Sequence, residues 1–312
     1  MTEGRRFVYG PVPSRRLGLS LGVDILPFKT CTLDCAYCQL GSTGKTVLRR
    51  ASYFPPKDIL AQIKEALDSG QRIDIITFSG SGEPTLNRDI GRLIRAIKRM
   101  TRVPVAVLTN GTLLGRADVR RDLAAADIVV PSLDAVPEGL FRRVNRPHPS
   151  LRSDKLIEGL ARFRKGFKGL IWLEVMFVKG VNDSPAHIRA LKKAADLIRP
   201  DRIHLNTVVR PPADVRAKPL SPGAMDKVRR ALGPRAEVVA SFKGRERPPA
   251  AVALDRAILD TVGRRPVTVE DITAALGRHR DEVLKAIVSL LRRGEVRESP
   301  HGGRTFFSRA RG

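Results

Sequence analysis

Short apolar runs alternate with amphipathic segments along most of this chain. Residues 73–78 and 103–108 are rich in Ile and Val, which is typical of strands buried on both faces. Residues 57–68 and 88–100 place apolar side chains three and four residues apart, as an amphipathic helix does. Strands that alternate with helices predict parallel βαβ units with right-handed crossovers, and therefore an α/β fold.

The same alternation predicts six strand repeats, followed by one more helix and strand. The expected strands are residues 20–26, 73–78, 103–108, 128–133, 170–178 and 202–209, and the last pair is 222–232 and 237–242. Further helices are expected at 116–124, 154–167 and 184–198, the last with Ser184 as N-cap. Six units are too few to close an eight-stranded barrel.

A second, smaller domain is expected at residues 250–312. It is separated from the domain of residues 1–242 by a polar stretch at 243–249 that reads as a linker. Three helical segments follow at 253–262, 269–276 and 281–292, and strand-like runs within 295–309 flank a turn. This order resembles a winged helix, which docks on nucleic acid or serves as a protein–protein or structural module. Both roles stay open at this point.

The only three cysteines of the chain, Cys31, Cys35 and Cys38, lie within eight residues. Thiolates hold iron–sulfur clusters, and three of them on one loop would leave the fourth iron of a [4Fe–4S] cluster open for a small molecule. Core cysteines or a zinc loop are the alternatives. Zinc sites, however, usually have four ligands in paired C-x2-C units or with histidines, and no histidine lies near this loop. The spacing therefore favours a [4Fe–4S] cluster in a reducing compartment.

With C-x3-C-x2-C and Tyr37 just before the third cysteine, the chain resembles the radical SAM superfamily. The resemblance implies an open, partial (β/α)6 barrel with its site at the carboxyl ends of the strands. It also implies that S-adenosylmethionine (SAM) binds the open iron and is cleaved by one electron to a 5'-deoxyadenosyl radical. The radical would take hydrogen directly from the substrate, since no fourth cysteine exists for a protein radical relay or for a methyl shuttle.

The turn after the second strand reads Gly80-Ser81-Gly82-Glu83-Pro84. By resemblance it corresponds to the GGE-type turn that holds the amino group of SAM, with Ser81 in place of the first glycine. Local explanations are open as well, because Asn-Gly at 110–111 is a common turn dipeptide and polar residues often end strands. The resemblance implies further SAM contacts from Tyr37, Asn110, Ser132, Asp134 and Asn206.

Residues 9–18, 144–149 and 205–212 narrow the resemblance to bacterial Fe–S oxidoreductases related to the wyosine-type tRNA-modifying enzymes, over roughly residues 7–215. The archaeal and eukaryotic wyosine enzymes carry further cysteines for a second cluster, and this chain has none. Expected contacts to substrate or phosphate are Arg15, Arg16, His148 and Arg210. Candidate catalytic residues are Glu174, Asn145 and Arg146, although Glu174 fits a structural salt bridge equally well.

The chain carries 57 Lys and Arg against 32 Asp and Glu, a net charge of +25. Such an excess attracts polyanions, so RNA or DNA is the first expected partner, unless the excess is a compositional bias. Together with the winged-helix-like domain and the wyosine-type resemblance, it makes RNA, with tRNA first, the expected substrate. The rival hypotheses are a protein or small-molecule substrate, and a non-catalytic Fe–S redox sensor that binds DNA through the C-terminal domain. We also expect an electron donor such as a ferredoxin or flavodoxin. Without a signal segment or an apolar run of bilayer length, a cytoplasmic protein without membrane contact is expected.

Overall fold

A computed structural model describes residues 6–14, 16–209, 212–240, 249–264, 266–276, 278–301 and 304–310. Arg15, Arg210 and residues 243–248 of the expected linker lie outside this range. The chain divides into two compact units. One is formed by Gly10–Phe242, and the other by Lys243–Gly312 together with Glu3–Tyr9.

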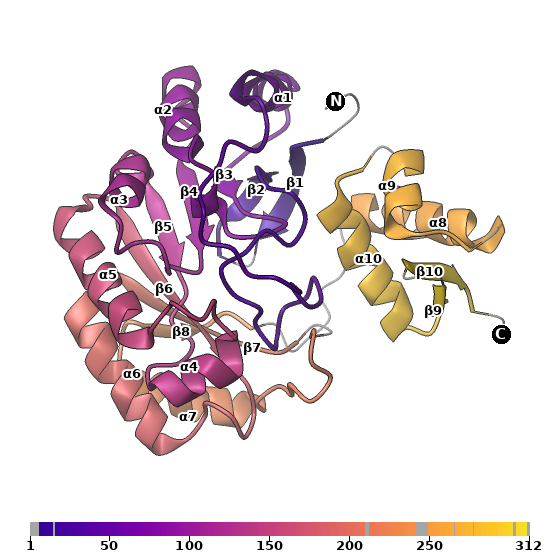
Figure 1. Cartoon of the computed structure of the whole chain (residues 1–312). Helices are drawn as coiled ribbons and strands as arrows, with labels where there is room; N and C mark the ends of the chain where they lie inside the picture. The colour runs from indigo at the N-terminus through magenta and orange to yellow at the C-terminus, as the bar shows by residue number, and fades with distance from the viewer. Residues whose placement is uncertain are drawn as a thin grey trace. The chain divides into compact units, whose positions relative to one another are not determined.

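The larger unit is built on an eight-stranded sheet in the order β1 to β8, and each neighbouring pair from β2–β3 to β7–β8 is parallel (Figure 1). This arrangement confirms the α/β prediction, and the six expected strand repeats are present as β2 to β7. The strand β1 (Val8–Ser14), beside β2, was not expected. The others are β2 (Gly18–Val23), β3 (Ile75–Phe78), β4 (Val105–Thr109), β5 (Ile128–Pro131), β6 (Leu170–Phe177), β7 (Arg202–Thr207) and β8 (Ala236–Val238).

Helices lie on the outside of the curved sheet (Figure 1). They are α1 (Pro56–Asp68), α2 (Ile90–Met100), α3 (Ala117–Leu123), α4 (Glu138–Asn145), α5 (Ser153–Gly166), α6 (Pro185–Ile198) and α7 (Pro222–Leu232), with a short 3-10 helix η1 (Pro84–Leu86). Ser184 caps α6 as predicted, since its hydroxyl accepts from the backbone N–H of His187. The sequence pattern missed α4, because two turns with Phe141 and Val144 as the buried apolar side chains are too short for a periodic signal.

The strands are buried on both faces, which explains their continuous apolar runs. All four residues of β3 and of β5 are buried, and side chains such as Ile75, Ala106 and Val130 form one cluster of the core. Register pairs Phe78 with Val107 and Thr109 with Pro131. The carboxyl ends of β3, β4 and β5 therefore meet at one edge of the sheet, and the loops that follow them are brought together.

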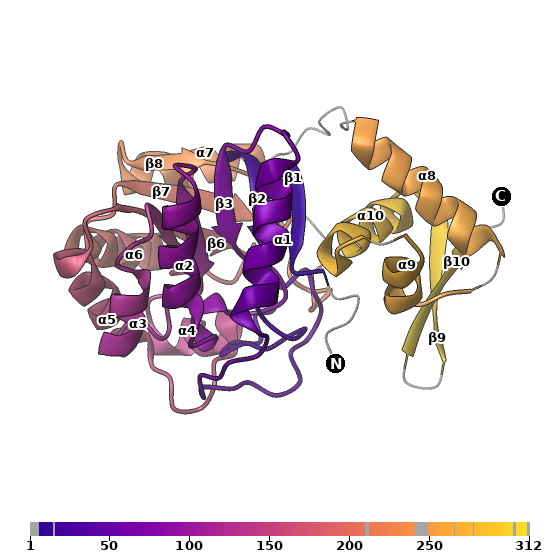
Figure 2. The ribbon, with the colours of Figure 1, turned by 90° about the horizontal axis from the view of Figure 1, so that it is seen from above.

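The smaller unit contains three helices followed by a hairpin (Figure 2): α8 (Pro249–Arg264), α9 (Val269–Leu276), α10 (Arg280–Arg292), β9 (Val296–His301) and β10 (Arg304–Arg309). Val267 pairs with Phe307 and adds a third short strand segment to the hairpin. Thr268 and Asp271 form a reciprocal capping box at the start of α9. No helix in the described part of the chain is long and apolar enough to cross a membrane.

Candidate functional site

The three cysteines lie on the loop that follows β2, and a distant segment holds this loop by its backbone. The N–H of Ala36 donates to the carbonyl of Val144 at 2.9 Å, and Leu33 pairs with Pro147 as in an antiparallel strand. The N–H of His148 donates to the carbonyl of Thr32 at 3.0 Å. The segment that ends α4 therefore fixes the conformation of the cysteine loop.

Each cysteine sulfur accepts a hydrogen bond from a different side chain. Lys29 Nζ lies 3.2 Å from Cys38 Sγ, Asn145 Nδ2 3.5 Å from Cys35 Sγ and Asn110 Nδ2 3.6 Å from Cys31 Sγ. Hydrogen-bond donors to sulfur stabilise the negative charge of a thiolate and change the reduction potential of a bound cluster. Asn110 and Asn145 were singled out from the sequence for other roles, and Lys29 for none.

The surroundings of Cys31 and Cys35 disfavour the charged form of these two thiols unless a cation is bound. Burial and the nearby Glu83 carboxylate raise the pKa of Cys31 to about 12. Burial, with Asp134 as the next cause, raises the pKa of Cys35 well above its usual range. Metal binding deprotonates such thiols, because the thiolate is the ligand. Three thiols on one loop, each with its own donor, fit a four-iron cluster bound at three corners, and the chain has no fourth cysteine for the remaining corner.

Asp134 lies behind the cysteine loop at 3% exposure and connects several of the predicted site residues. Its carboxylate accepts from the Tyr37 hydroxyl, from Asn145 Nδ2 at 2.7 Å and from the N–H of Met176 at 2.8 Å. Burial raises the pKa of Asp134 to about 6. The Asp134 carboxylate thus positions Tyr37 and Asn145 beside Cys35.

The turn Gly80–Pro84 packs against the residues that precede Cys31. The N–H of Lys29 donates to the carbonyl of Ser81 at 2.6 Å, and that of Glu83 to the carbonyl of Thr30 at 2.9 Å. A Cβ on Gly82 would lie 2.0 Å from the Thr30 oxygen, so only glycine fits there. The Ser81 hydroxyl donates to Asp24, which gives this departure from the GGE pattern a partner within the fold.

Glu83 ties the ends of two strands together. Its buried carboxylate accepts from the N–H of Thr85 at 3.0 Å, from the Thr109 hydroxyl at 2.6 Å and from the N–H of Asn110 at 2.6 Å. Burial raises the pKa of Glu83 in spite of these bonds. The turn, Asn110 and the cysteine loop are therefore brought to one edge of the sheet, while their contact with SAM stays a prediction.

A second polar cluster joins Glu174 to two other predicted residues. The two terminal nitrogens of the Arg16 guanidinium, Nη1 and Nη2, donate to its carboxylate at 2.9 and 3.0 Å, and Asn206 Nδ2 donates to it at 2.8 Å. Ser132 pairs with Glu174 through the backbone across β5 and β6. The salt bridge considered for Glu174 is therefore present, and a catalytic role remains a prediction.

The other expected contacts lie farther along the loops. Arg146, in the left-handed region at φ 43°, is paired with Asp214. His148 Nδ1 lies 2.9 Å from the Ser150 hydroxyl in an exposed turn. Their proposed contact with substrate is not tested by these positions.

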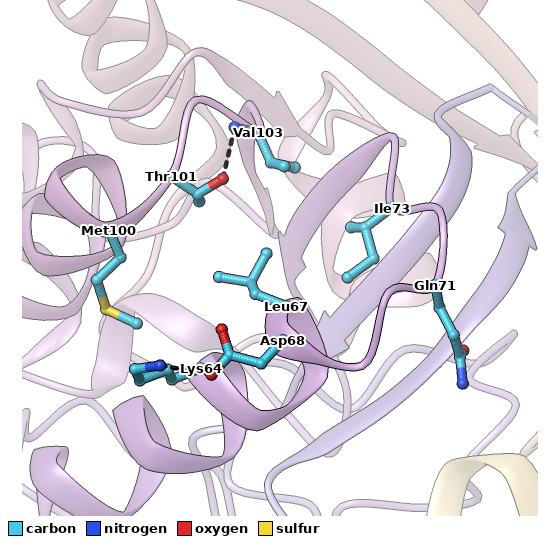
Figure 3. A pocket seen from close by; sticks show the side chains of 8 residues that line it. All are labelled: Lys64, Leu67, Asp68, Gln71, Ile73, Met100, Thr101 and Val103. Carbon is cyan, nitrogen blue, oxygen red and sulfur yellow. Dashed lines mark hydrogen bonds and ion pairs between the residues drawn. The ribbon is translucent and has the colours of Figure 1, made fainter.

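A surface pocket of about 490 Å³ lies between the C-terminal parts of α1 and α2 (Figure 3). Lys64, Leu67 and Met100 are among its lining residues. This end of the helices precedes the next strand, so the pocket lies at the end of the sheet opposite to the cysteine loop. Its lining residues belong to none of the networks above, and we therefore place the site at the cysteine loop.

The fold and the cysteine loop define a class of protein that comparison with known families confirms. Residues 25–206, more than half of the chain, match the radical SAM superfamily. The chain belongs to this superfamily, whose enzymes use a [4Fe–4S] cluster and SAM. The resemblance drawn from Cys31, Cys35 and Cys38 is thereby confirmed, together with the two cofactors that it implied.

Among known proteins, the chain is similar to a GTPase Obg of Brachyspira hyodysenteriae, with 38% identity over 294 residues. That match covers 93% of this chain and 43% of the relative. A UPF0026 protein of Methanocaldococcus jannaschii is 36% identical over 213 residues, which is 68% of this chain and 66% of the relative. This chain therefore spans less than two thirds of either relative.

Among solved structures, TYW1 with a lysine-pyruvate adduct bound has a similar fold, with a TM-score of 0.53 and 19% identity. The shared part covers 68% of this chain and 72% of that protein. At this identity the likeness concerns the fold alone. It agrees with the barrel-like arrangement of β2 to β7 and of the helices outside them.

Proposed function

We propose that this chain binds one [4Fe–4S] cluster through Cys31, Cys35 and Cys38 and uses SAM to take a hydrogen atom from an RNA, with tRNA as the first candidate. The observation that carries the cluster assignment is the set of three thiols on one loop, each with its own hydrogen-bond donor. The position of the Gly80–Pro84 turn against this loop supports SAM as the ligand of the open iron.

Held by Cys31, Cys35 and Cys38, a reduced cluster would supply the one electron that cleaves a C–S bond of SAM to methionine and a 5'-deoxyadenosyl radical, and this radical would take hydrogen from the substrate. A ferredoxin or flavodoxin is the class of donor that we propose. The N–H donors of Lys29, Asn110 and Asn145 stabilise the negative charge on the cysteine sulfurs by hydrogen bonding. The burial of Glu83 and Asp134 keeps both carboxylates fixed and shielded from water.

The substrate class rests on charge. A net charge of +25 favours a polyanion over a neutral peptide or a small molecule. We further propose that the smaller unit is a winged helix that helps to hold the RNA. Its support is the order of three helices and a hairpin, with the short Val267–Phe307 pairing beside the hairpin.

The cluster and SAM steps are tested by anaerobic reconstitution with iron and sulfide, reduction with dithionite, and chromatography of 5'-deoxyadenosine. The wild-type protein should form 5'-deoxyadenosine, and Cys35→Ala should reduce its formation at least about a thousandfold, because two thiolates hold the cluster poorly. Gln71→Ala, which lines the pocket at the opposite end of the sheet, is the matched control and should behave as wild type.

The same experiment separates the rival hypotheses. A well-formed cluster that neither binds nor cleaves SAM would contradict the enzyme proposal and favour the redox sensor. If SAM is cleaved, bulk tRNA should increase 5'-deoxyadenosine formation and yield a nucleoside of changed mass. Stimulation by a peptide or small molecule, with tRNA inert, would contradict the RNA part alone.

A further inference from the structure

The exposed face of α2 carries a row of arginines. Arg92, Arg95 and Arg99 are three and four residues apart and therefore lie on one side of the helix. Arg88 precedes the N-cap residue of α2 and Arg102 follows the extended residue that ends it, and all five side chains are exposed. We call these five residues the arginine stripe.

The arginine stripe is not neutralised by the fold. Within the described part of the chain, none of its five guanidinium groups has a hydrogen bond or ion pair. The helix α2 contains no acidic residue, and the carboxylate of its N-cap residue, Asp89, accepts from Ser52. Lys98, the remaining cation of α2, is paired with Asp127 at 2.6 Å.

Four other helices of the same unit each pair at least one cation with a carboxylate of their own, whereas Arg189 and Lys193 of α6 have no such partner in the described part of the chain. Such pairs are Lys64–Asp68 on α1, Arg142–Glu138 on α4, Lys155–Glu158 on α5 and Arg230–Asp226 on α7. Like charges three or four residues apart instead destabilise a helix by about 0.2–0.5 kcal/mol per pair. The Arg92–Arg95 and Arg95–Arg99 pairs therefore weaken α2, so these arginines do not serve the stability of the helix, and this argues for a binding role.

The place of the arginine stripe relates it to the candidate site. Arg88 follows Asn87, the residue that ends η1, and η1 begins at the last residue of the Gly80–Pro84 turn. The helix α2 connects the carboxyl end of β3 to the start of β4 and lies outside the sheet (Figure 2). The stripe therefore begins near the cysteine-loop edge and continues along α2 toward the opposite edge. Arg92 and Arg99 are about 10 Å apart along the helix axis, a length over which one nucleic-acid strand presents about three phosphates.

We propose that the arginine stripe binds the sugar–phosphate backbone of the RNA substrate and leads it to the cysteine-loop edge. This inference rests on the RNA substrate proposed above. The planar guanidinium group suits phosphate because it donates two parallel hydrogen bonds. The five unpaired arginines, three of them in one row on α2, provide such donors without first breaking a bond within the protein.

The test compares two triple variants of the full chain that remove the same charge. One is Arg92→Gln, Arg95→Gln and Arg99→Gln. The matched control is Arg162→Gln, Arg189→Gln and Lys193→Gln, on exposed positions of α5 and α6. Binding of fluorescent bulk tRNA is measured by anisotropy over a series of salt concentrations.

At 0.15 M salt the stripe variant should bind tRNA roughly a hundredfold more weakly than wild type. This estimate takes a loss of about fivefold in affinity for each of the three phosphate contacts removed. Its slope of log affinity against log salt should fall by about 2 to 3, while the control variant should change both quantities little. Dithionite-driven SAM cleavage without RNA should be equal in both variants, which shows that the fold and the cluster are intact.

Three outcomes would overturn the inference in distinguishable ways. Equal weakening in both variants would show that net charge matters and the stripe does not, while the RNA proposal stands. Failure of the wild-type protein itself to bind tRNA would overturn the RNA proposal and the inference together. Wild-type binding to DNA of matched length as tight as to tRNA, and equally lost in the stripe variant, would make the stripe a nucleic-acid surface without the RNA role.

Discussion

Arg50 and Arg95 show two opposite uses of arginine in the same unit. The side chain of Arg50 is 7% exposed, and its guanidinium donates to the carbonyl of Thr85 at 2.8 Å and to Asp118 and Asp122 of α3. Arg95 lies on the exposed face of α2 and has no partner in the described part of the chain. Both contribute equally to the net charge, yet one holds the segment after the Gly80–Pro84 turn and the other is available to a ligand.

The comparison extends to the rest of the candidate site. Arg16 is paired with Glu174, and Arg146 shares the carboxylate of Asp214 with Arg216, so these guanidinium groups already have partners within the fold. The uncompensated charges of the arginine stripe lie on a helix outside the sheet. The net charge of +25 alone is therefore a poor measure of how well the protein binds polyanions. Only the arginines without a partner in the fold are available for binding.

The largest effect should come from Gly82→Ala, at the most crowded point of the site edge. The new Cβ would meet the Thr30 carbonyl oxygen at 2.0 Å, so the backbone of the turn or of the cysteine loop must shift. We expect a loss of about 3 kcal/mol or more in the free energy of unfolding, and loss of SAM binding by calorimetry. Gly139→Ala, where a Cβ meets nothing within 4 Å, should be neutral or stabilise α4 by about 0.5–1 kcal/mol. Equal stability of the two variants would contradict this prediction, because it would show that the backbone of the turn shifts at little energetic cost.

A somewhat smaller loss is expected from Arg50→Met, which keeps the apolar stem and removes the guanidinium. Asp118 and Asp122 would lose their shared partner, and two backbone carbonyls, of Thr85 and Asn87, would lose a donor. Because both carboxylates are partly exposed, we expect about 2–3 kcal/mol, below the range for a fully buried pair. Urea unfolding measures this change, and a loss under about 1 kcal/mol would contradict the structural role of Arg50.

The smallest effect, of opposite sign, is expected from Arg95→Gln. Removing its charge relieves the repulsion from Arg92 and Arg99, so the protein should become more stable by about 0.5 kcal/mol at low salt. The gain should vanish in about 1 M salt, where the Debye length is near 3 Å. Urea unfolding at both salt concentrations provides the measurement. Destabilisation would mean that Arg95 has a partner within the fold, and the contrast with Arg50 would fail.

Features that are contiguous in the chain could be predicted from the sequence. The spacing of Cys31, Cys35 and Cys38, the Gly80–Pro84 turn and the six strand repeats depend on neighbours a few residues away, and the pattern indicates them directly. The Ser184 cap belongs to the same group. The short helix α4 could not be predicted in this way, because its position depends on packing against the cysteine loop rather than on a periodic pattern of its own.

What each side chain touches was decided by the tertiary structure. Asn145 was a candidate catalytic residue, and its amide donates to Cys35 and Asp134. Lys29, which contacts Cys38, has a left-handed backbone conformation at φ 61°. No local sequence pattern predicts this conformation.

The amino-acid sequence by itself determined the superfamily, the cofactors and the alternation of strands and helices, because these follow from residue type and spacing. Only the tertiary structure decided which charges are neutralised. An ion pair such as Arg16–Glu174 joins residues 158 positions apart, and their separation in space depends on the register of the whole sheet. The arginine stripe became visible for the same reason, since an unpaired charge is recognised only when its surroundings are known.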